Sequence, residues 1–167
     1  MTGAILIVPA DPRAASVRVL LEAHLALARA ATPREHSFAL DIEGLVQPGI
    51  AFFAARRDHE VVGVGAIKHL DPSHAEVKSM HTRHDLRGRG IGTAMLRHLL
   101  AFAAQRGYRR VSLETGTTPE FAGARALYTQ AGFRPCAPFG HYAPSPHNAF
   151  FTINLEQPDE HLAGPEQ

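Results

Sequence analysis

Hydrophobic and polar positions in the first third of the chain predict a strand, a long helix and an irregular segment. The apolar run 4–8 is short and rich in β-branched residues, as is typical of a strand. Asp11 and Pro12 then resemble a helix N-cap with proline at the first helical position, and apolar residues recur at helical spacing until Pro33. The segment 32–49 fits neither period, so we expect a loop with one short helix.

The next apolar segments predict an antiparallel meander. Residues 50–55 and 61–67 flank a polar corner, and a third strand, 75–82, follows a turn at residues 71–72. Alternation in the third strand is imperfect. A β-bulge near Ser79 would account for the break.

The second half of the chain begins with a strongly patterned helix. Apolar positions form a helical stripe over residues 91–106, and the strand 110–114 follows. Thr117 and Glu120 then resemble a capping box, which predicts a helix that continues to Gln130.

Two short strands, 133–136 and 148–155, end the pattern, and a proline-rich loop joins them. We therefore expect one mixed α+β domain over residues 1–156 and a polar tail over residues 157–167. A single crossover between parallel strands, through the helix 91–106, is available in this order of elements.

Composition limits the classes of function. The chain has 17 Lys and Arg against 16 Asp and Glu, so its net charge of +1 gives no reason to expect nucleic acid or a membrane surface as a partner. Apolar stretches are far shorter than the roughly 20 residues of a transmembrane helix. Cys136 is the single cysteine, and the closest histidine pair, His81 and His84, lacks a third metal ligand. We expect a cytoplasmic protein without a metal site.

Candidate chemistry concentrates in the loop before the helix 91–106, which combines three glycines with two arginines. The residues are Arg87, Gly88, Arg89, Gly90, Ile91, Gly92 and Thr93. Glycines let the chain turn tightly and expose consecutive backbone N–H groups, and the start of a helix adds partial positive charge. The loop therefore predicts a binding site for a phosphate group.

Two nucleotide-binding motifs are alternatives for this loop. A triphosphate-binding loop requires a lysine that residues 92–94 lack. A dinucleotide fingerprint is closer, because Gly88 and Gly90 are followed by the acidic Glu114. However, its third glycine comes one position early, and the strand 76–81 is too polar for the centre of a parallel sheet. A nicotinamide-dependent oxidoreductase is therefore the weaker alternative.

The loop resembles the motif Arg/Gln-x-x-Gly-x-Gly/Ala of the GNAT N-acetyltransferase superfamily, in which Arg87, Gly90 and Gly92 occupy the fixed positions. A second segment, 124–128 followed by 131–133, is similar to a later part of the family, where a helix that carries a tyrosine ends in Gly-Phe. The two motifs lie at the separation found in the family.

This resemblance covers residues 50–155 and implies a single GNAT domain of the α+β class. Such a domain has a mixed central sheet of about six or seven strands, helices on both faces, and acetyl-CoA in the cleft between splayed middle strands. The resemblance implies acetyl-CoA as co-substrate, a primary amine as acceptor and no metal. The implied CoA contacts are the loop residues 87–93 together with Met80, His81, Thr82, Ala124 and Tyr128.

Catalysis needs an acid and a base. By the same resemblance, Tyr128 donates a proton to the departing thiolate of CoA. A base must also remove a proton from the amine. Glu114 is the first candidate, at the end of a strand, and Glu76 and His81 are the others, His81 because its ordinary pKa suits proton transfer near neutral pH. The alternative for each of these three residues is a solvated or structurally paired side chain without a catalytic role.

The acceptor is less closely defined by the sequence. Phe139 and Tyr142 lie in the proline-rich loop, where they would form a wall of the acceptor pocket or pack over the core. Lys68, Lys78 and Arg134 are candidates to bind a carboxylate. A small amine or an amino acid is the expected acceptor.

Two further functions and one assembly stay open. Protein lysines or N-termini are the alternative acceptors, and a catalytically silent acyl-CoA-binding module is the alternative class. Related enzymes often pair through their final strands, which makes Phe150 and Phe151 candidate contacts of a homodimer.

Overall fold

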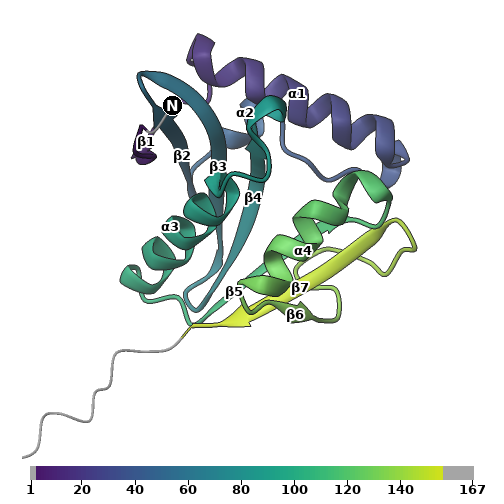
Figure 1. Cartoon of the computed structure of the whole chain (residues 1–167). Helices are drawn as coiled ribbons and strands as arrows, with labels where there is room; N and C mark the ends of the chain where they lie inside the picture. Colours follow the sequence, from purple (N-terminus) through teal and green to yellow (C-terminus); the bar gives the residue numbers. More distant parts are fainter. Residues whose placement is uncertain (1–2, 156–167) are drawn as a thin grey trace, which may run out of the picture.

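The computed structural model describes residues 3–155 of the 167-residue chain (Figure 1), so the predicted polar tail, 157–167, lies outside the described residues. Within that range seven strands form one sheet in the order β1-β2-β3-β4-β5-β7-β6. The strands are β1 (Leu6–Pro9), β2 (Ile50–Arg57), β3 (Glu60–Asp71), β4 (His74–Thr82), β5 (Arg110–Gly116), β6 (Arg134–Pro135) and β7 (Asn148–Asn154). Neighbours are antiparallel except β4 and β5, which are parallel. The predicted mixed α+β sheet is confirmed.

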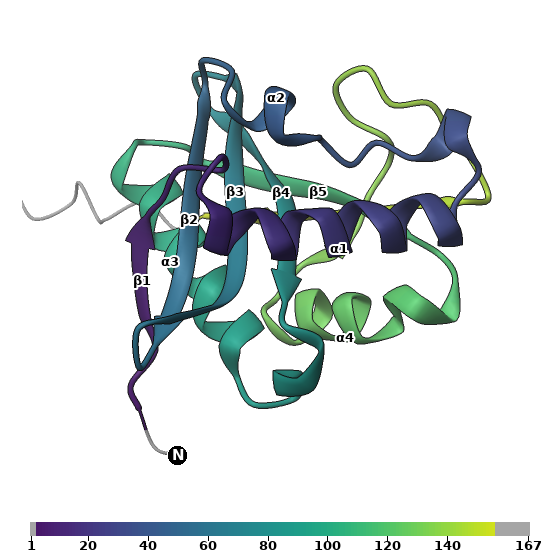
Figure 2. The same cartoon turned by 90° about the horizontal axis from the view of Figure 1, so that it is seen from above.

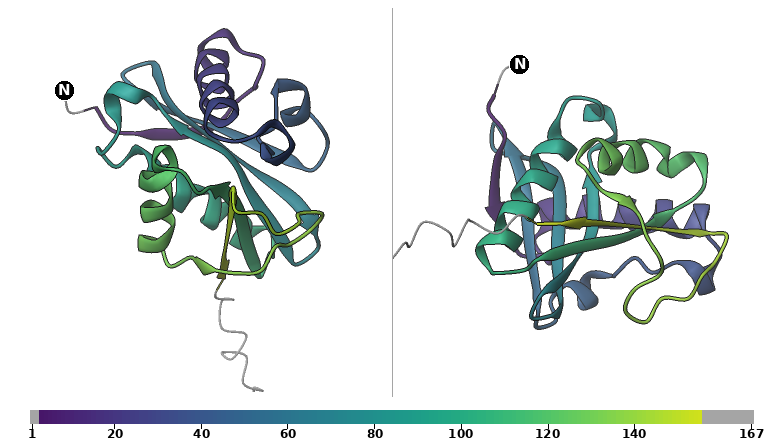
Figure 3. Two further views of the ribbon diagram at one scale, coloured as in Figure 1. Left: turned by 90° about the vertical axis from the view of Figure 1, so that its right-hand side faces the viewer. Right: turned by 90° about the horizontal axis from the view of Figure 1, so that it is seen from below.

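Helices cover both faces of this sheet (Figure 3). They are α1 (Ala15–Ala31), α2 (Ile42–Leu45), α3 (Ile91–Gln105) and α4 (Ala122–Gln130). One buried cluster joins α1 and α2 to one face, and a larger cluster joins α3 and α4 to the other. Seen from above, α1 runs across β2, β3 and β4 (Figure 2). Two hydrophobic layers therefore enclose the central strands.

The start of α1 differs from the prediction. The helix begins at Ala15, and its N-cap residue, Ala14, makes no side-chain capping bond. Asp11 instead accepts the backbone N–H of Arg13 at 2.9 Å, and its carbonyl accepts the N–H of Ala14 at 3.0 Å. An aspartate that bonds the residues just after it closes a local turn, which is a competing use of the same side chain.

The predicted capping box before α4 is also wrong. Thr117 donates its hydroxyl to the carbonyl of Pro146 at 2.8 Å, a partner on the proline-rich loop. The chain then makes a 3-10 turn, Pro119–Phe121, and α4 begins at Ala122. A long-range bond has therefore replaced the local cap.

The predicted bulge in β4 is confirmed. Across from β3, His81 pairs with Val64 and Lys78 pairs with Ala66, so one extra residue lies on β4, and Ser79 has a φ of +56°. Val64 and Ala66 belong to the cluster under α1. Lys78 and His81 therefore both face α1, although side chains three positions apart in a regular strand would point to opposite faces.

The parallel strands β4 and β5 pair only near their starts. Their three paired positions end at Glu76 and Ser112, whereas the strands continue to Thr82 and Gly116. Beyond Glu76, the edge of β4 that faces β5 has no strand partner within residues 3–155. The sheet is thus split at its middle, as the family resemblance implies.

The candidate dimer contacts are buried inside the chain. Phe150 and Phe151 are 7% and 8% exposed. The ring of Phe150 packs against Phe139 and Tyr142, and the ring of Phe151 packs against Tyr128. These two residues therefore offer no apolar edge to a second copy, and the homodimer stays a prediction.

Candidate active site

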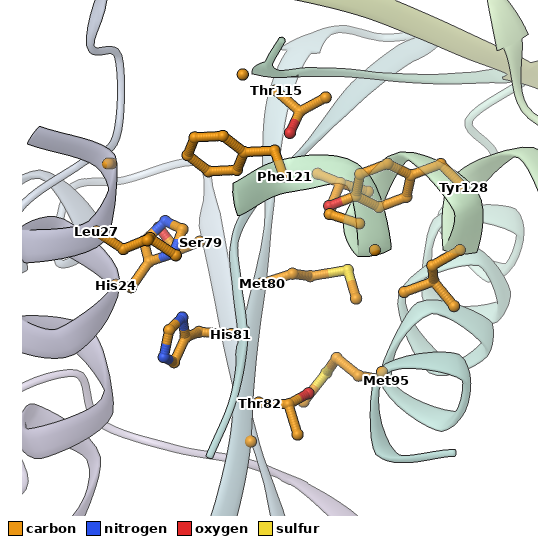
Figure 4. A pocket seen from close by; sticks show the side chains of 18 of the residues that line it. His24, Leu27, Ser79, Met80, His81, Thr82, Met95, Thr115, Phe121 and Tyr128 are labelled. Atoms are coloured by element: carbon orange, nitrogen blue, oxygen red, sulfur yellow. The ribbon is translucent and has the colours of Figure 1, made fainter. Parts of the chain in front are cut away.

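A cavity of about 580 Å³ opens where β4 and β5 separate (Figure 4). One side is lined by α1 and the segment 36–39, and the other by α3, α4 and the glycine loop. Because the sheet is split here, side chains from both of its faces reach a single space.

The glycine loop presents unused donors at the start of α3. The N-cap residue Gly90 has a φ of +86°, Gly88 has a φ of +77°, and the first helical bond runs from the N–H of Ala94 to the carbonyl of Gly90. Among the described residues, the backbone N–H groups of residues 88–93 have no acceptor. Glycine is needed at Gly88 and Gly90 for the backbone angle, since an added Cβ would meet nothing within 4 Å. Six adjacent donors at a helix start can bind an anion.

Of the two arginines in the loop, the structure brings one to the cavity. Arg87 lines it, and its Nε donates to the carbonyl of Thr82 at 3.4 Å, at the end of β4. Arg89 is exposed and does not line the cavity. Arg87 therefore adds a cationic group to the cavity beside the glycine loop.

Tyr128 reaches the cavity from α4. Its ring is buried against Phe133 and Phe151, with centroid distances of 5.9 Å and 6.5 Å, and its hydroxyl points into the cavity (Figure 4). Burial, reinforced by the nearby Glu114 carboxylate, raises the pKa of Tyr128 to about 12. The hydroxyl is therefore protonated at neutral pH and can donate a proton.

Glu114 lines the cavity from β5. Its Oε1 accepts a hydrogen bond from Nδ2 of Asn148 at 2.7 Å, and the same Nδ2 donates to the carbonyl of His36 at 2.8 Å. Burial raises the pKa of Glu114 above its ordinary value, although the bond from Asn148 opposes this shift. The result is a carboxylate held in one orientation and more basic than a solvated one.

The other two base candidates differ in their surroundings. Glu76 is buried and does not line the cavity; it accepts the hydroxyl of Tyr142 at 2.5 Å and lies 3.4 Å from Nζ of Lys78. His81 lines the cavity, and burial, followed by the charge of Arg87, lowers its pKa to about 4. Glu76 is therefore engaged with protein partners, and His81 is neutral at pH 7 but a weak base.

The sequence profile described as the Acetyltransferase (GNAT) family matches residues 19–133, more than half of the chain. The uncharacterized N-acetyltransferase YsnE of Bacillus subtilis (strain 168) is 40% identical over 136 residues, which cover 81% of this chain and 90% of that protein. IAA acetyltransferase of Azospirillum brasilense is 38% identical over 124 residues, or 74% and 80% of the two chains. The crystal structure of a proposed acyl-CoA N-acyltransferase from Klebsiella pneumoniae superimposes with a TM-score of 0.75 at 28% identity, covering 91% of this chain and 98% of that one.

The chain belongs to the GNAT acetyltransferase family. It is an N-acetyltransferase, and its co-substrate is acetyl-CoA. Two structures of the same fold contain a bound ligand of this kind, acetyl-CoA in one and coenzyme A in the other. The dinucleotide-binding alternative is therefore wrong. The expectation that the strand 76–81 is too polar for the centre of the sheet is also wrong. That strand lies at the centre, with its polar side chains buried beside the cavity of the GNAT domain.

Of the cationic candidates for a carboxylate site, only Lys78 lines the cavity, and its ammonium group is engaged with protein partners. Nζ of Lys78 donates to the carbonyl of Phe38 at 3.2 Å and to the hydroxyl of Tyr142 at 2.9 Å, besides its contact with Glu76. Lys68 and Arg134 do not line the cavity. The ammonium group of Lys78 instead ties the segment 36–39 to the sheet of this acetyltransferase.

The aromatic pair on the proline-rich loop lies outside the cavity. Phe139 is buried against His74, Tyr142 and Phe150, which is the packing role weighed from the sequence. The ring of Tyr142 packs against Phe38, with centroids 5.0 Å apart, and its hydroxyl bonds Glu76. Neither side chain belongs to the cavity lining.

A different wall of the cavity was missed from the sequence. It consists of the segment 36–39 and of His24, Leu27 and Ala28 on α1. One signal was available: His24 lies four residues after Leu20 in the buried stripe of α1, where an imidazole is unusual.

Within residues 3–155, no group of three or more metal-ligating side chains comes together, and no helix there is long and apolar enough to cross a membrane.

Proposed function

We propose that this GNAT enzyme transfers the acetyl group of acetyl-CoA to the primary amine of a small molecule or an amino acid by direct attack of the amine. The observation that carries the proposal is one cavity, at the split between β4 and β5, into which the donor-rich loop, Tyr128 and Glu114 all open. An acid, a base and an anion site are the parts that this reaction needs.

Acetyl-CoA supplies the reactive acetyl thioester when it is bound. The N–H groups of residues 88–93, which lack an acceptor in the described part of the chain, would hold its pyrophosphate together with the guanidinium of Arg87, whose Nε bonds the carbonyl of Thr82. Thr93 and Ala124 line the same half of the cavity. The residues present therefore fit the charged part of the co-substrate.

The backbone of β4 fits the arm between the pyrophosphate and the sulfur. In the described part of the chain, residues 80–82 have no strand partner on the side of β5, so their backbone groups on that side would pair with the amides of the pantetheine arm. Their N–H groups would also polarise the thioester carbonyl. Fixed backbone donors stabilise developing negative charge without having to reorganise.

Proton transfer is assigned to two side chains. Glu114 would accept a proton from the attacking amine, because its carboxylate faces the cavity, is oriented by Asn148 and has a raised pKa. Tyr128 would donate a proton to the CoA sulfur, because its pKa of about 12 keeps the hydroxyl protonated. His81 and Glu76 rank behind Glu114, since His81 is a weak base and Glu76 is already paired with Lys78.

A small acceptor is favoured over a protein chain by how the α1 side of the cavity is closed. The segment 36–39 forms part of this wall, and Lys78 and Asn148 fix it through the carbonyls of Phe38 and His36. A volume of about 580 Å³ is within the range of small-molecule sites. The relative from A. brasilense is named for one compound, IAA, rather than for a protein.

The cytoplasmic location of the protein stays a prediction.

The proposal is tested by measuring thiol release from acetyl-CoA with a panel of small amines and amino acids, alongside calorimetric binding of acetyl-CoA. We expect thiol release that depends on the amine. Tight binding without release for any amine would support the silent acyl-CoA-binding module instead. Release only with lysine-containing peptides or free protein N-termini would support the protein acetyltransferase.

A further inference from the structure

Three polar side chains meet on the α1 side of the cavity. His24 comes from the inward stripe of α1, and Ser79 and His81 come from the bulged part of β4. The rings of His24 and His81 contact edge to face, with centroids 5.4 Å apart (Figure 4). The bulge produces this arrangement, because it turns His81 toward α1.

None of the three has a hydrogen-bonding partner in the described part of the chain. The hydroxyl of Ser79 is buried and unpaired, in a residue that is only 7% exposed. The imidazole nitrogens of His24 and His81 make no hydrogen bond to protein groups between residues 3 and 155. Buried polar groups in native proteins are nearly always paired, so the unpaired hydroxyl of Ser79, beside two imidazoles that open to the cavity, indicates a site for a polar group.

The chemistry of the cluster indicates which polar group fits. Each of the three side chains can donate a hydrogen bond, and a carboxylate accepts several such bonds at once without needing to donate any. Lys78, the cationic side chain on the same wall, is already bonded to three protein groups. Burial lowers the pKa of His24 and of His81 to about 4, and an anion between the rings would oppose that shift.

We propose that His24, Ser79 and His81 bind a carboxylate of the acceptor, which is therefore an amino acid or another amino-carboxylate. The inference rests on the proposed function and narrows its substrate class. Glu114 then takes the amine end of the acceptor, and the histidine cluster takes the acid end. The two ends of the acceptor would thus bind to different walls of the cavity. This placement would orient the amine toward the thioester.

The test compares matched acceptors in wild type and in two variants. Each L-amino acid is assayed beside its own carboxamide, which keeps the amine and removes the negative charge. His24→Phe keeps a ring of similar shape but removes the donors, and it should raise the KM of the preferred amino acid by about 10- to 100-fold, the range for losing a hydrogen bond to a charged group. The KM values of the carboxamide and of acetyl-CoA should change less than about twofold.

A matched control is available on α3. His98 is also a partly buried histidine with a lowered pKa, but its ring packs on Phe53 and does not line the cavity. His98→Phe should leave the KM of the amino acid unchanged. A second readout needs no turnover: addition of the amino acid to the CoA-saturated protein should shift the imidazole NMR signals of His24 and His81, and addition of the carboxamide should not.

The inference fails if carboxamides are acetylated as well as the acids, or if His24→Phe lowers activity with both by the same factor. Either result would leave amine acetylation itself intact. A lack of thiol release with every amine would instead contradict the proposed function. In that case the imidazole signals alone decide, and equal shifts with acid and amide, or none with either, overturn the carboxylate site.

Discussion

Removal of the Tyr128 hydroxyl is the sharpest perturbation of the proposed chemistry. Tyr128→Phe leaves the ring packed against Phe133 and Phe151 and deletes one polar atom that bonds no described protein group. Loss of proton donation by a positioned side chain costs about 10²- to 10⁴-fold in rate. That range corresponds to about 2.7 to 5.4 kcal/mol of activation free energy. We expect kcat and kcat/KM to fall together by this amount.

Two controls separate a lost proton donor from a damaged fold. Unfolding free energy measured in urea should change by less than about 1 kcal/mol, because no protein hydrogen bond is lost. When the acetyl donor is the thioester of a more acidic thiol, its thiolate departs without needing a proton. The rate deficit of Tyr128→Phe should therefore be smaller with that acetyl donor. Because the pKa of Tyr128 is about 12, wild type and variant should show the same pH dependence between pH 7 and pH 10.

The assay is steady-state thiol release at saturating acceptor, with both thioesters and both proteins. A kcat within about threefold of wild type would refute the role of Tyr128 as acid. A large loss that is equal for both thioesters would also refute it, because such a loss would not depend on protonation of the leaving sulfur.

Three other substitutions test neighbouring parts of the account. Glu114→Gln should lower kcat/KM by about 10²- to 10⁴-fold. It should also abolish the rise of activity with pH through the pKa of Glu114, which burial places above the ordinary glutamate value. An unchanged pH-rate profile would contradict the role of Glu114 as base. Arg87→Ala should raise the KM for acetyl-CoA about tenfold and leave that of the amine unchanged, and two unchanged constants would mean that the loop is misassigned. Lys78→Met strands the buried carboxylate of Glu76 and should lower the unfolding free energy by about 3 to 5 kcal/mol, with partial recovery when Glu76→Gln is added. A loss below about 1 kcal/mol in urea would show that the buried pair is not needed.

The hydrophobic pattern predicted most of the elements of the sheet and the helices, because burial of one face imposes a regular period. It failed where a side chain had a choice of partners. Asp11 bonds Arg13 rather than capping α1, and Thr117 bonds Pro146 across the fold rather than capping α4. Local sequence cannot distinguish a cap from a turn when both satisfy the same donors.

The part of the cavity formed by the glycine loop and Tyr128 was predictable from the sequence, and the wall on the α1 side was not. The glycine loop and Tyr128 belong to short continuous motifs, so their spacing identifies them. The wall formed by His24, the segment 36–39 and β4 is assembled from segments distant in sequence, and the bulge at Ser79 decides which β4 side chains belong to it. That rearrangement of faces could be suspected from the broken alternation, but its consequence for His81 required the register of β3 and β4.

The central claim is that CoA binds along the glycine loop and the unpaired edge of β4. A titration of the isotopically labelled protein with CoA, followed by backbone amide NMR, tests it directly. The largest shifts should fall on the amides of residues 88–93, whose N–H groups have no acceptor in the described structure, and on residues 80–82 of β4. Shifts confined to another region, such as the shallow second cavity formed by Pro9–Arg13, Leu45 and Phe52, would contradict the account.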